Sequence, residues 1–237
     1  MKLVFIRHGD PDYAHDSLTE KGFREAELLS ERVRNWKNVT AFYVSPLGRA
    51  QRTAEPCLQK SGRTATTLDW LREFFYPIED AKTGEKCIPW DFMPADWTKE
   101  EALFDKDEWS LTPRMRSGEV GAHYRAVCDS LDELLLQYGY RRHGNYYIAE
   151  RDRGDTLVFF CHFGVSMVML SHLLNVSPVV LWQGLFCAPT SVTVLCSEQR
   201  ENRDAYFRAF CVGDTSHLRT GGEPASASGY FADPFLD

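Results

Sequence analysis

Residues 1–10, MKLVFIRHGD, place a short apolar run directly before an Arg-His-Gly tripeptide made of Arg7, His8 and Gly9. A continuous apolar run of this length is typical of a strand that is buried on both faces of a parallel sheet. In open α/β sheets, ligands bind beyond the carboxyl ends of such strands. The stretch therefore predicts a buried first strand that delivers polar side chains to a ligand-binding edge.

The rest of the chain alternates apolar strands with amphipathic helices. Residues 17–36 repeat apolar side chains at helical intervals from Phe23 to Trp36, and Ser17 and Glu20 have the spacing of a capping box. Further helices are expected at 48–62, 119–140 and 164–175, and further strands at 41–45, 65–71, 155–162, 191–198 and 205–214. This order predicts an α/β fold, a three-layer α/β/α sandwich with a mainly parallel central sheet.

We expect a single domain over residues 1–237, with two irregular segments. Residues 74–115 lack a clear periodicity and are interrupted by prolines, which predicts a cap insertion over the C-terminal strand edge. Its large aromatic residues either form a wall for an organic leaving group or pack the cap itself; they are Trp90, Phe92, Trp97, Phe104 and Trp109. Residues 218–237 are rich in Gly, Ser and Ala and predict a loosely ordered tail.

Composition narrows the class of protein. A net charge of −7 argues against a general nucleic-acid binder, and no apolar run reaches the length of a membrane span. Seven cysteines without a Cys-x-x-Cys pair fit reduced thiols in a cytoplasm. We therefore expect a cytoplasmic protein that binds neither nucleic acid nor membrane, and the sequence leaves a homodimer open.

Polar side chains follow four of the expected strands. Arg7 and His8 end the first strand, Arg49 lies beyond the second, Glu73 ends the third, and His162 ends the fourth. Because the carboxyl ends of parallel strands meet at one edge, we expect these five side chains to converge. A guanidinium binds phosphate through paired hydrogen bonds, an imidazole can attack phosphorus, and a carboxyl group with a raised pKa can protonate a leaving alkoxide.

A second Arg-His-Gly tripeptide occupies residues 142–144. It is expected to follow a helix rather than a strand, and the Gly144-Asn145 pair indicates a turn. Location therefore favours the first copy as the one that carries chemistry.

Four motifs in this order resemble the histidine phosphatase superfamily: RHG at 7–9, SPLGRAQRTA at 45–54, the glutamate of LREF at 71–74, and CHFG at 161–164. The resemblance spans residues 1–73 and 155–198. It implies that His8 is the phosphoryl-accepting nucleophile and that Arg7, Arg49 and His162 bind the phosphoryl oxygens. Glu73 would be the proton donor, His162 a member of the catalytic set, and neither a metal nor another cofactor is implied.

Two assignments stay open at this point. LREFFYPIED lacks the glycine that many relatives carry shortly after the carboxylate, so Glu79 and Asp80 compete with Glu73 for the role of acid. His217 follows the last expected strand and either approaches the site or caps a turn.

The resemblance covers both mutases and phosphatases. A mutase pattern would place a hydroxyl residue two positions after Gly9, followed by a Trp-Asn pair, whereas this chain has Pro11 and neither partner. The sequence therefore favours a metal-independent phosphatase that hydrolyses a small phosphorylated metabolite through a phosphohistidine. Phosphoglycerate mutase-type transfer is the alternative, and a non-catalytic phosphate-recognition module is a third reading.

Overall fold

The computed structural model describes residues 1–80, 83–151 and 154–230. Its main sheet has eight strands in the order β5-β4-β10-β1-β11-β12-β9-β8. The first four in that order are parallel to one another: β5 (Ala65–Thr67), β4 (Ala41–Val44), β10 (Thr156–Cys161) and β1 (Lys2–Arg7). The remaining four join antiparallel: β11 (Val192–Gln199), β12 (Asp204–Asp214), β9 (Tyr146–Ala149) and β8 (Tyr140–His143). Parallel pairing is thus confined to the half of the sheet that β1 completes.

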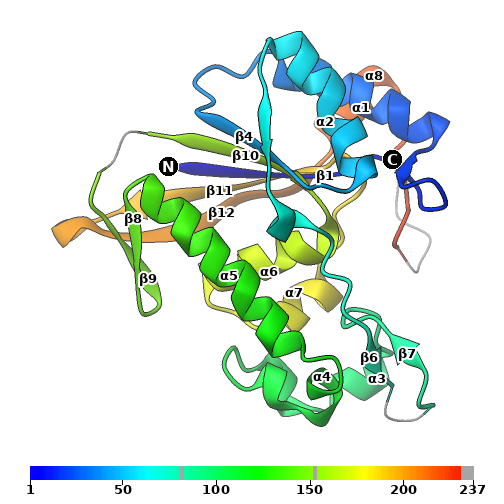
Figure 1. Ribbon diagram of the computed structural model, residues 1–237, viewed down its shortest axis with the longest axis vertical. Helices are drawn as coiled ribbons and strands as arrows, with labels where there is room; N and C mark the ends of the chain where they lie inside the picture. Colours follow the sequence, from blue (N-terminus) through cyan, green and yellow to red (C-terminus); the bar gives the residue numbers. More distant parts are fainter. Residues whose placement is uncertain (81–82, 152–153, 231–237) are drawn as a thin grey trace.

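Helices cover both faces of this sheet, so the expected three-layer α/β/α sandwich is confirmed (Figure 1). One face carries α1 (Glu20–Val33), α2 (Gly48–Ser61) and α8 (Ser216–Gly221). The other carries α5 (Val120–Gln137), α6 (Phe163–Leu174) and α7 (Pro178–Gly184). Two small strands, β2 (Pro11–Asp12) and β3 (Ser17–Leu18), form a hairpin just after β1.

Strand β1 is buried on both faces because its side chains alternate between two cores. Val4 and Ile6 pack toward α1 and α2, while Leu3 and Phe5 pack toward α5 and α6. Phe159 of β10 lies between Phe5 and Tyr43, with ring centroids 5.3 and 5.4 Å apart. This burial on both faces fixes the positions of the C-terminal ends of β1 and β10 in the sheet. It therefore also fixes where the residues that follow these strands lie.

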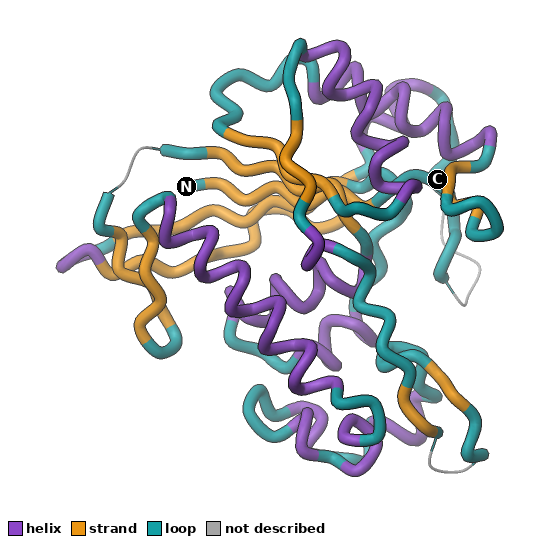
Figure 2. The backbone as a smooth tube through the Cα atoms, viewed as in Figure 1, coloured by secondary structure: helices purple, strands orange, loops and turns teal. Residues whose placement is uncertain are grey.

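The described residues between 74 and 115 form a lobe of turns and short elements at the edge of the molecule (Figure 2). It contains the hairpin of β6 (Ile78–Glu79) and β7 (Lys86–Cys87) and the short helices α3 (Pro94–Trp97) and α4 (Pro113–Arg116). Phe92 and Trp109 are buried within the same core that lies under α5 and α6. The ring centroids of Trp97 and Phe104 are 5.0 Å apart and the rings are tilted by 30°, so most of the cap aromatics pack within this segment.

Three local expectations were wrong. Thr19, rather than Ser17, caps α1 by accepting a hydrogen bond from the Gly22 N–H, because Ser17 pairs in β3. Phe23 was expected on the buried face of that helix but is 48% exposed. The second Arg-His-Gly tripeptide ends strand β8 of a hairpin instead of following a helix directly.

The segment expected to be a loosely ordered tail begins inside α8, where His217 and Leu218 are buried. Farther on, Ser226 donates a hydrogen bond to Asp10, and the ring of Tyr230 contacts Phe186 at 4.6 Å. The tail therefore crosses the loops that follow β1 and α7, and residues 231–237 lie outside the described residues.

We expect Phe159→Ala to lower the free energy of unfolding by about 3–5 kcal/mol, because it opens a cavity between two stacked rings. Phe23→Ala is the matched control and should change it by no more than about 0.5 kcal/mol, since that ring is half in solvent. Urea unfolding followed by circular dichroism measures both. An equal loss in the two variants would show that Phe23 is buried as its spacing first indicated.

Candidate active site

The loop after β1 sets the chemical state of His8. The imidazole Nδ1 lies 2.7 Å from the carbonyl oxygen of Gly9. A carbonyl can only accept, so Nδ1 carries the hydrogen, and in a neutral ring the lone pair is then on Nε2. Burial, reinforced by the charge of Arg7, lowers the pKa of His8 well below its ordinary value. The lowered pKa therefore favours a neutral His8, whose lone pair is on Nε2.

His162 faces His8 from the end of β10. The two ring centroids are 5.1 Å apart and the rings are tilted by 57°. His162 Nε2 is 2.7 Å from the hydroxyl oxygen of Ser45, which directly follows β4. Burial first, then the neighbouring His8 and Arg49, lowers the pKa of His162 well below its ordinary value. Three parallel strands thus contribute one residue each to this part of the site.

Arg7 is buried and is held by the loop that follows α7. Its Nη1 donates to the carbonyl oxygen of Cys187 at 2.7 Å. The N–H of Thr190 in turn donates to the carbonyl oxygens of both Arg7 and His8, each at 3.1 Å. His217 lies one step behind, with its Nε2 3.1 Å from the hydroxyl of Thr190. His217 therefore supports the backbone of the site from α8, and burial lowers its pKa to about 4.

Arg49 stands in the first turn of α2. Its Nη1 donates to a carboxylate oxygen of Asp16 at 2.7 Å, and its guanidinium lies 5.5 Å from the centre of the Tyr13 ring. Thr53, one turn later, accepts a hydrogen bond from the Gly9 N–H and donates one to the carbonyl oxygen of Arg49. This hydroxyl ties the first turn of α2 to the loop that carries His8.

Glu73 reaches the site from the segment after β5. One of its carboxylate oxygens accepts hydrogen bonds from the N–H groups of Phe74 and Val165, at 2.7 and 3.1 Å. A Cβ atom added at Gly164 would lie 2.7 Å from that same oxygen and 2.7 Å from the Trp90 ring, so only glycine leaves room there. Burial raises the pKa of Glu73, while these N–H groups and Arg49 oppose the rise. A raised pKa suits a carboxyl group that must hold a proton.

Several polar atoms of these side chains have no partner among the described residues. They are the Nε atoms of Arg7 and Arg49 and the Nδ1 atom of His162, and all three are buried. A buried donor without a partner costs about 1–3 kcal/mol. Positive or neutral donors left open around a neutral imidazole make a site for an anion with several oxygens, such as a phosphoryl group.

The structure brings together Arg7, His8, Arg49, Glu73 and His162, the five residues selected from the sequence. The competing carboxylates lie elsewhere: Glu79 is exposed on β6, and Asp80 accepts a hydrogen bond from the Thr83 N–H in the hairpin turn. His143 is exposed on the edge strand β8, with three strands between it and β1. Asp16, Ser45, Thr53 and Thr190 also shape the site, and sequence spacing had not indicated these roles.

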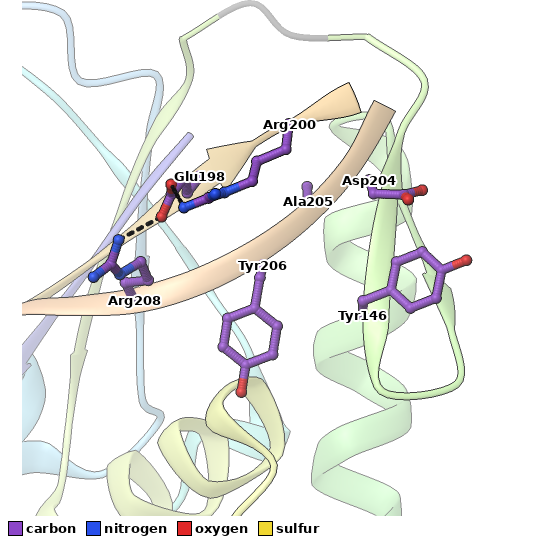
Figure 3. Close-up of a pocket in the computed structure, with 7 residues that line it drawn as sticks. All are labelled: Tyr146, Glu198, Arg200, Asp204, Ala205, Tyr206 and Arg208. Atoms are coloured by element: carbon purple, nitrogen blue, oxygen red, sulfur yellow. Dashed lines mark hydrogen bonds and ion pairs between the residues drawn. The ribbon is translucent and has the colours of Figure 1, made fainter. Parts of the chain in front are cut away.

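A separate hollow lies on the edge of the sheet formed by β9, β11 and β12 (Figure 3). Its two arginines, Arg200 and Arg208, both pair with Glu198 at 2.6 Å. None of the five convergent residues lines it. Within the described ranges, no group of three or more His, Cys, Asp or Glu side chains is arranged to hold a metal ion, and no helix is long and apolar enough to span a bilayer.

Solved structures with the same fold were found among phosphatases. A phosphoserine phosphatase from Entamoeba histolytica, in complex with 3-phosphoglyceric acid, has a TM-score of 0.60 and 18% identity, with 92% of this chain and 98% of that chain covered. A mycobacterial glucosyl-3-phosphoglycerate phosphatase has a TM-score of 0.56 and 21% identity over 90% and 98% of the two chains. At these identities the likeness establishes the fold.

Sequence relatives agree with the motifs. The probable phosphoglycerate mutase GpmB of Yersinia pestis is 28% identical over 144 residues, which cover 56% of this chain and 64% of that protein. The alignment therefore spans just under two thirds of its length. The profile of the histidine phosphatase superfamily, branch 1, matches residues 3–205. With the profile matched over nearly the whole sheet and all four motifs at one edge, this chain belongs to the histidine phosphatase superfamily.

Proposed function

We propose that this protein is a phosphatase that hydrolyses a small phosphorylated metabolite through a phosphohistidine on His8, without a metal ion. One observation carries the proposal: the imidazole nitrogen of His8 that bears a lone pair lies in the same site as buried side-chain nitrogens that have no hydrogen-bond partner. His8 is neutral with its lone pair on Nε2, and Arg7, Arg49 and His162 leave buried nitrogens open beside it. Two guanidinium groups supply the positive charge that a transferring phosphoryl group requires.

The residues support a two-step reaction. In the first step, Nε2 of His8 forms a bond to phosphorus as the bond from phosphorus to the leaving oxygen breaks, and Glu73 gives that oxygen a proton. In the second step, the Glu73 carboxylate takes a proton from water as the water oxygen bonds to phosphorus. The bond from phosphorus to His8 breaks, and inorganic phosphate leaves with both residues restored.

Hydrolysis is favoured over mutase transfer by the loop after Gly9. Pro11 pairs with Leu18 in the small hairpin, and Asp10 is bound by Thr19 and Ser226. These residues add no side-chain donor to the phosphoryl pocket, whereas a mutase must hold two phosphoryl groups in turn. Three of the similar solved structures are named as phosphatases, which points the same way.

Two alternatives are carried by specific observations. The name of the Yersinia relative favours phosphoglycerate mutase activity. A non-catalytic phosphate-recognition module would need the pocket but not the acid. The space left by Gly164 and the hydrogen bond from the Val165 N–H hold the Glu73 carboxylate at the site, which argues for catalysis. An assay that measures both release of inorganic phosphate and interconversion of phosphoglycerates separates the three functions. A phosphatase mainly releases phosphate, a mutase mainly interconverts phosphoglycerates, and a recognition module does neither.

We expect His8→Ala to reduce hydrolysis of p-nitrophenyl phosphate by about a thousandfold or more, because it removes the atom that accepts the phosphoryl group. His143→Ala, in the second Arg-His-Gly tripeptide, is the matched control and should keep wild-type activity. A steady-state assay in the presence of a chelator measures both.

The intermediate has its own test. Rapid quenching of a reaction with labelled substrate should trap a phosphoenzyme. Its label should be stable in base and labile in acid, and it should form only when His8 is present. If single-turnover quenching traps none, or if His143→Ala loses as much activity as His8→Ala, the assignment of the nucleophile is wrong.

We expect activity to fall as pH rises through the raised pKa of Glu73, because the carboxyl group must begin the cycle protonated. The lowered pKa of His8 keeps the nucleophile neutral on the acid side. Glu73→Gln should lose about 10²–10⁴-fold in kcat with an alkyl phosphate, should lose less with p-nitrophenyl phosphate, and should lack the alkaline limb. Glu79→Gln is the control, and a loss there instead would move the acid to the cap hairpin.

A further inference from the structure

Asp16 holds Arg49 and the start of helix α2 at the same time. One of its carboxylate oxygens accepts the Arg49 Nη1 donor at 2.7 Å, and the other accepts the Gly48 N–H at 2.6 Å. The residue at the N-cap position of α2 is Leu47, whose side chain makes no capping bond. Asp16 therefore supplies from the β2–β3 turn the anionic partner that the helix terminus would otherwise lack.

The backbone is shaped for this contact. A Cβ atom added at Gly48 would lie 2.1 Å from the carbonyl oxygen of Asp16, so glycine is required where the turn meets the helix. Asp16 itself has a φ of 45°, a left-handed conformation that aspartate and asparagine adopt more readily than most residues. The close approach at Gly48 and the left-handed backbone of Asp16 thus bring the Asp16 carboxylate to Arg49.

The contact also decides which edge of Arg49 is free. Asp16 occupies Nη1, while Nε is buried and has no partner among the described residues. The Nε–H and the adjacent Nη2–H of a guanidinium point in parallel and form the edge that accepts two oxygens at once. The side chain of Arg49 is 11% exposed, so its geometry is set by these contacts rather than by solvent.

Resting on the phosphatase function proposed above, we infer that Asp16 is a positioning residue: it fixes Arg49 so that the Nε–Nη2 edge faces the phosphoryl group. Asp16 touches neither the substrate nor the reacting atoms in this arrangement. It acts through Arg49, and it links the turn of residues 13–16 to the strength with which the site binds phosphate.

The sign of one measurement separates positioning from simple charge. If Asp16 were only a carboxylate near an anion site, its neutralisation would strengthen phosphate binding by removing repulsion. If it positions Arg49, Asp16→Asn should weaken binding of inorganic phosphate by about tenfold, the scale of one hydrogen bond to a charged group. Isothermal titration calorimetry with inorganic phosphate on the whole chain measures the sign and size.

Two further variants define the cause. Asp16→Glu keeps the charge but moves the carboxylate, so it should also weaken binding. Asp12→Asn removes a carboxylate from the end of β2 in the same hairpin. The partners of Asp12 are His15 and Ala14, so binding should stay within about twofold of wild type. Asparagine suits the φ of 45° at position 16, so Asp16→Asn should fold, which its melting temperature checks.

A double-mutant cycle completes the test. In an Arg49→Ala background, Asp16→Asn should cause no further loss of phosphate affinity, because its effect passes through that arginine. Tighter or unchanged binding in Asp16→Asn, or an equal loss in both backgrounds, overturns the inference. Because phosphate binding is measured without turnover, a wild-type protein that binds phosphate but hydrolyses nothing would refute the proposed function and leave this inference intact.

Discussion

The arrangement depends on holding two guanidinium groups beside two buried imidazoles. Such a cluster is expensive to desolvate, and the protein limits the cost in two ways. The imidazoles of His8 and His162 stay neutral because their pKa values are lowered. Each arginine keeps one fixed acceptor, the carbonyl oxygen of Cys187 for Arg7 and the Asp16 carboxylate for Arg49. What remains open is a set of buried nitrogen atoms, Nε of both arginines and Nδ1 of His162, that have no partner among the described residues.

The sequence predicted the convergence of the site because strand order alone places it. An apolar run marks a buried parallel strand, and the residue after such a run must lie at the carboxyl edge of the sheet. That rule located Arg7, His8 and His162 directly. It located Arg49 and Glu73 less directly, because each lies several residues beyond its strand, and the room for Glu73 depends on Gly164 in another element.

Contacts between loops could not be predicted in this way. Asp16 meets Arg49 across 33 positions, and Thr53 meets Gly9 across 44, so no local periodicity encodes either pair. The hairpin of β8 and β9 was also missed, since its strands are only four residues long and β8 (YRRH) is mostly charged. Local propensity failed at Phe23 because a helical repeat fixes an angle around the axis but not how far the neighbouring layer extends.

The cap contributes one side chain where the leaving group must depart. Most of its aromatic residues pack against one another or in the core, but the Trp90 ring lies against Gly164, beside the carboxylate oxygen of Glu73. If Glu73 is the acid that we propose, it must touch the bond that breaks, which would bring the organic part of the substrate close to the Trp90 ring. In the proposed reaction, the phosphoryl group would therefore meet residues at the edge of the sheet and the first turn of α2, and the leaving group would meet the Trp90 ring. The proposed function therefore assigns the phosphoryl chemistry and the choice of leaving group to different parts of the chain, with Glu73 between them.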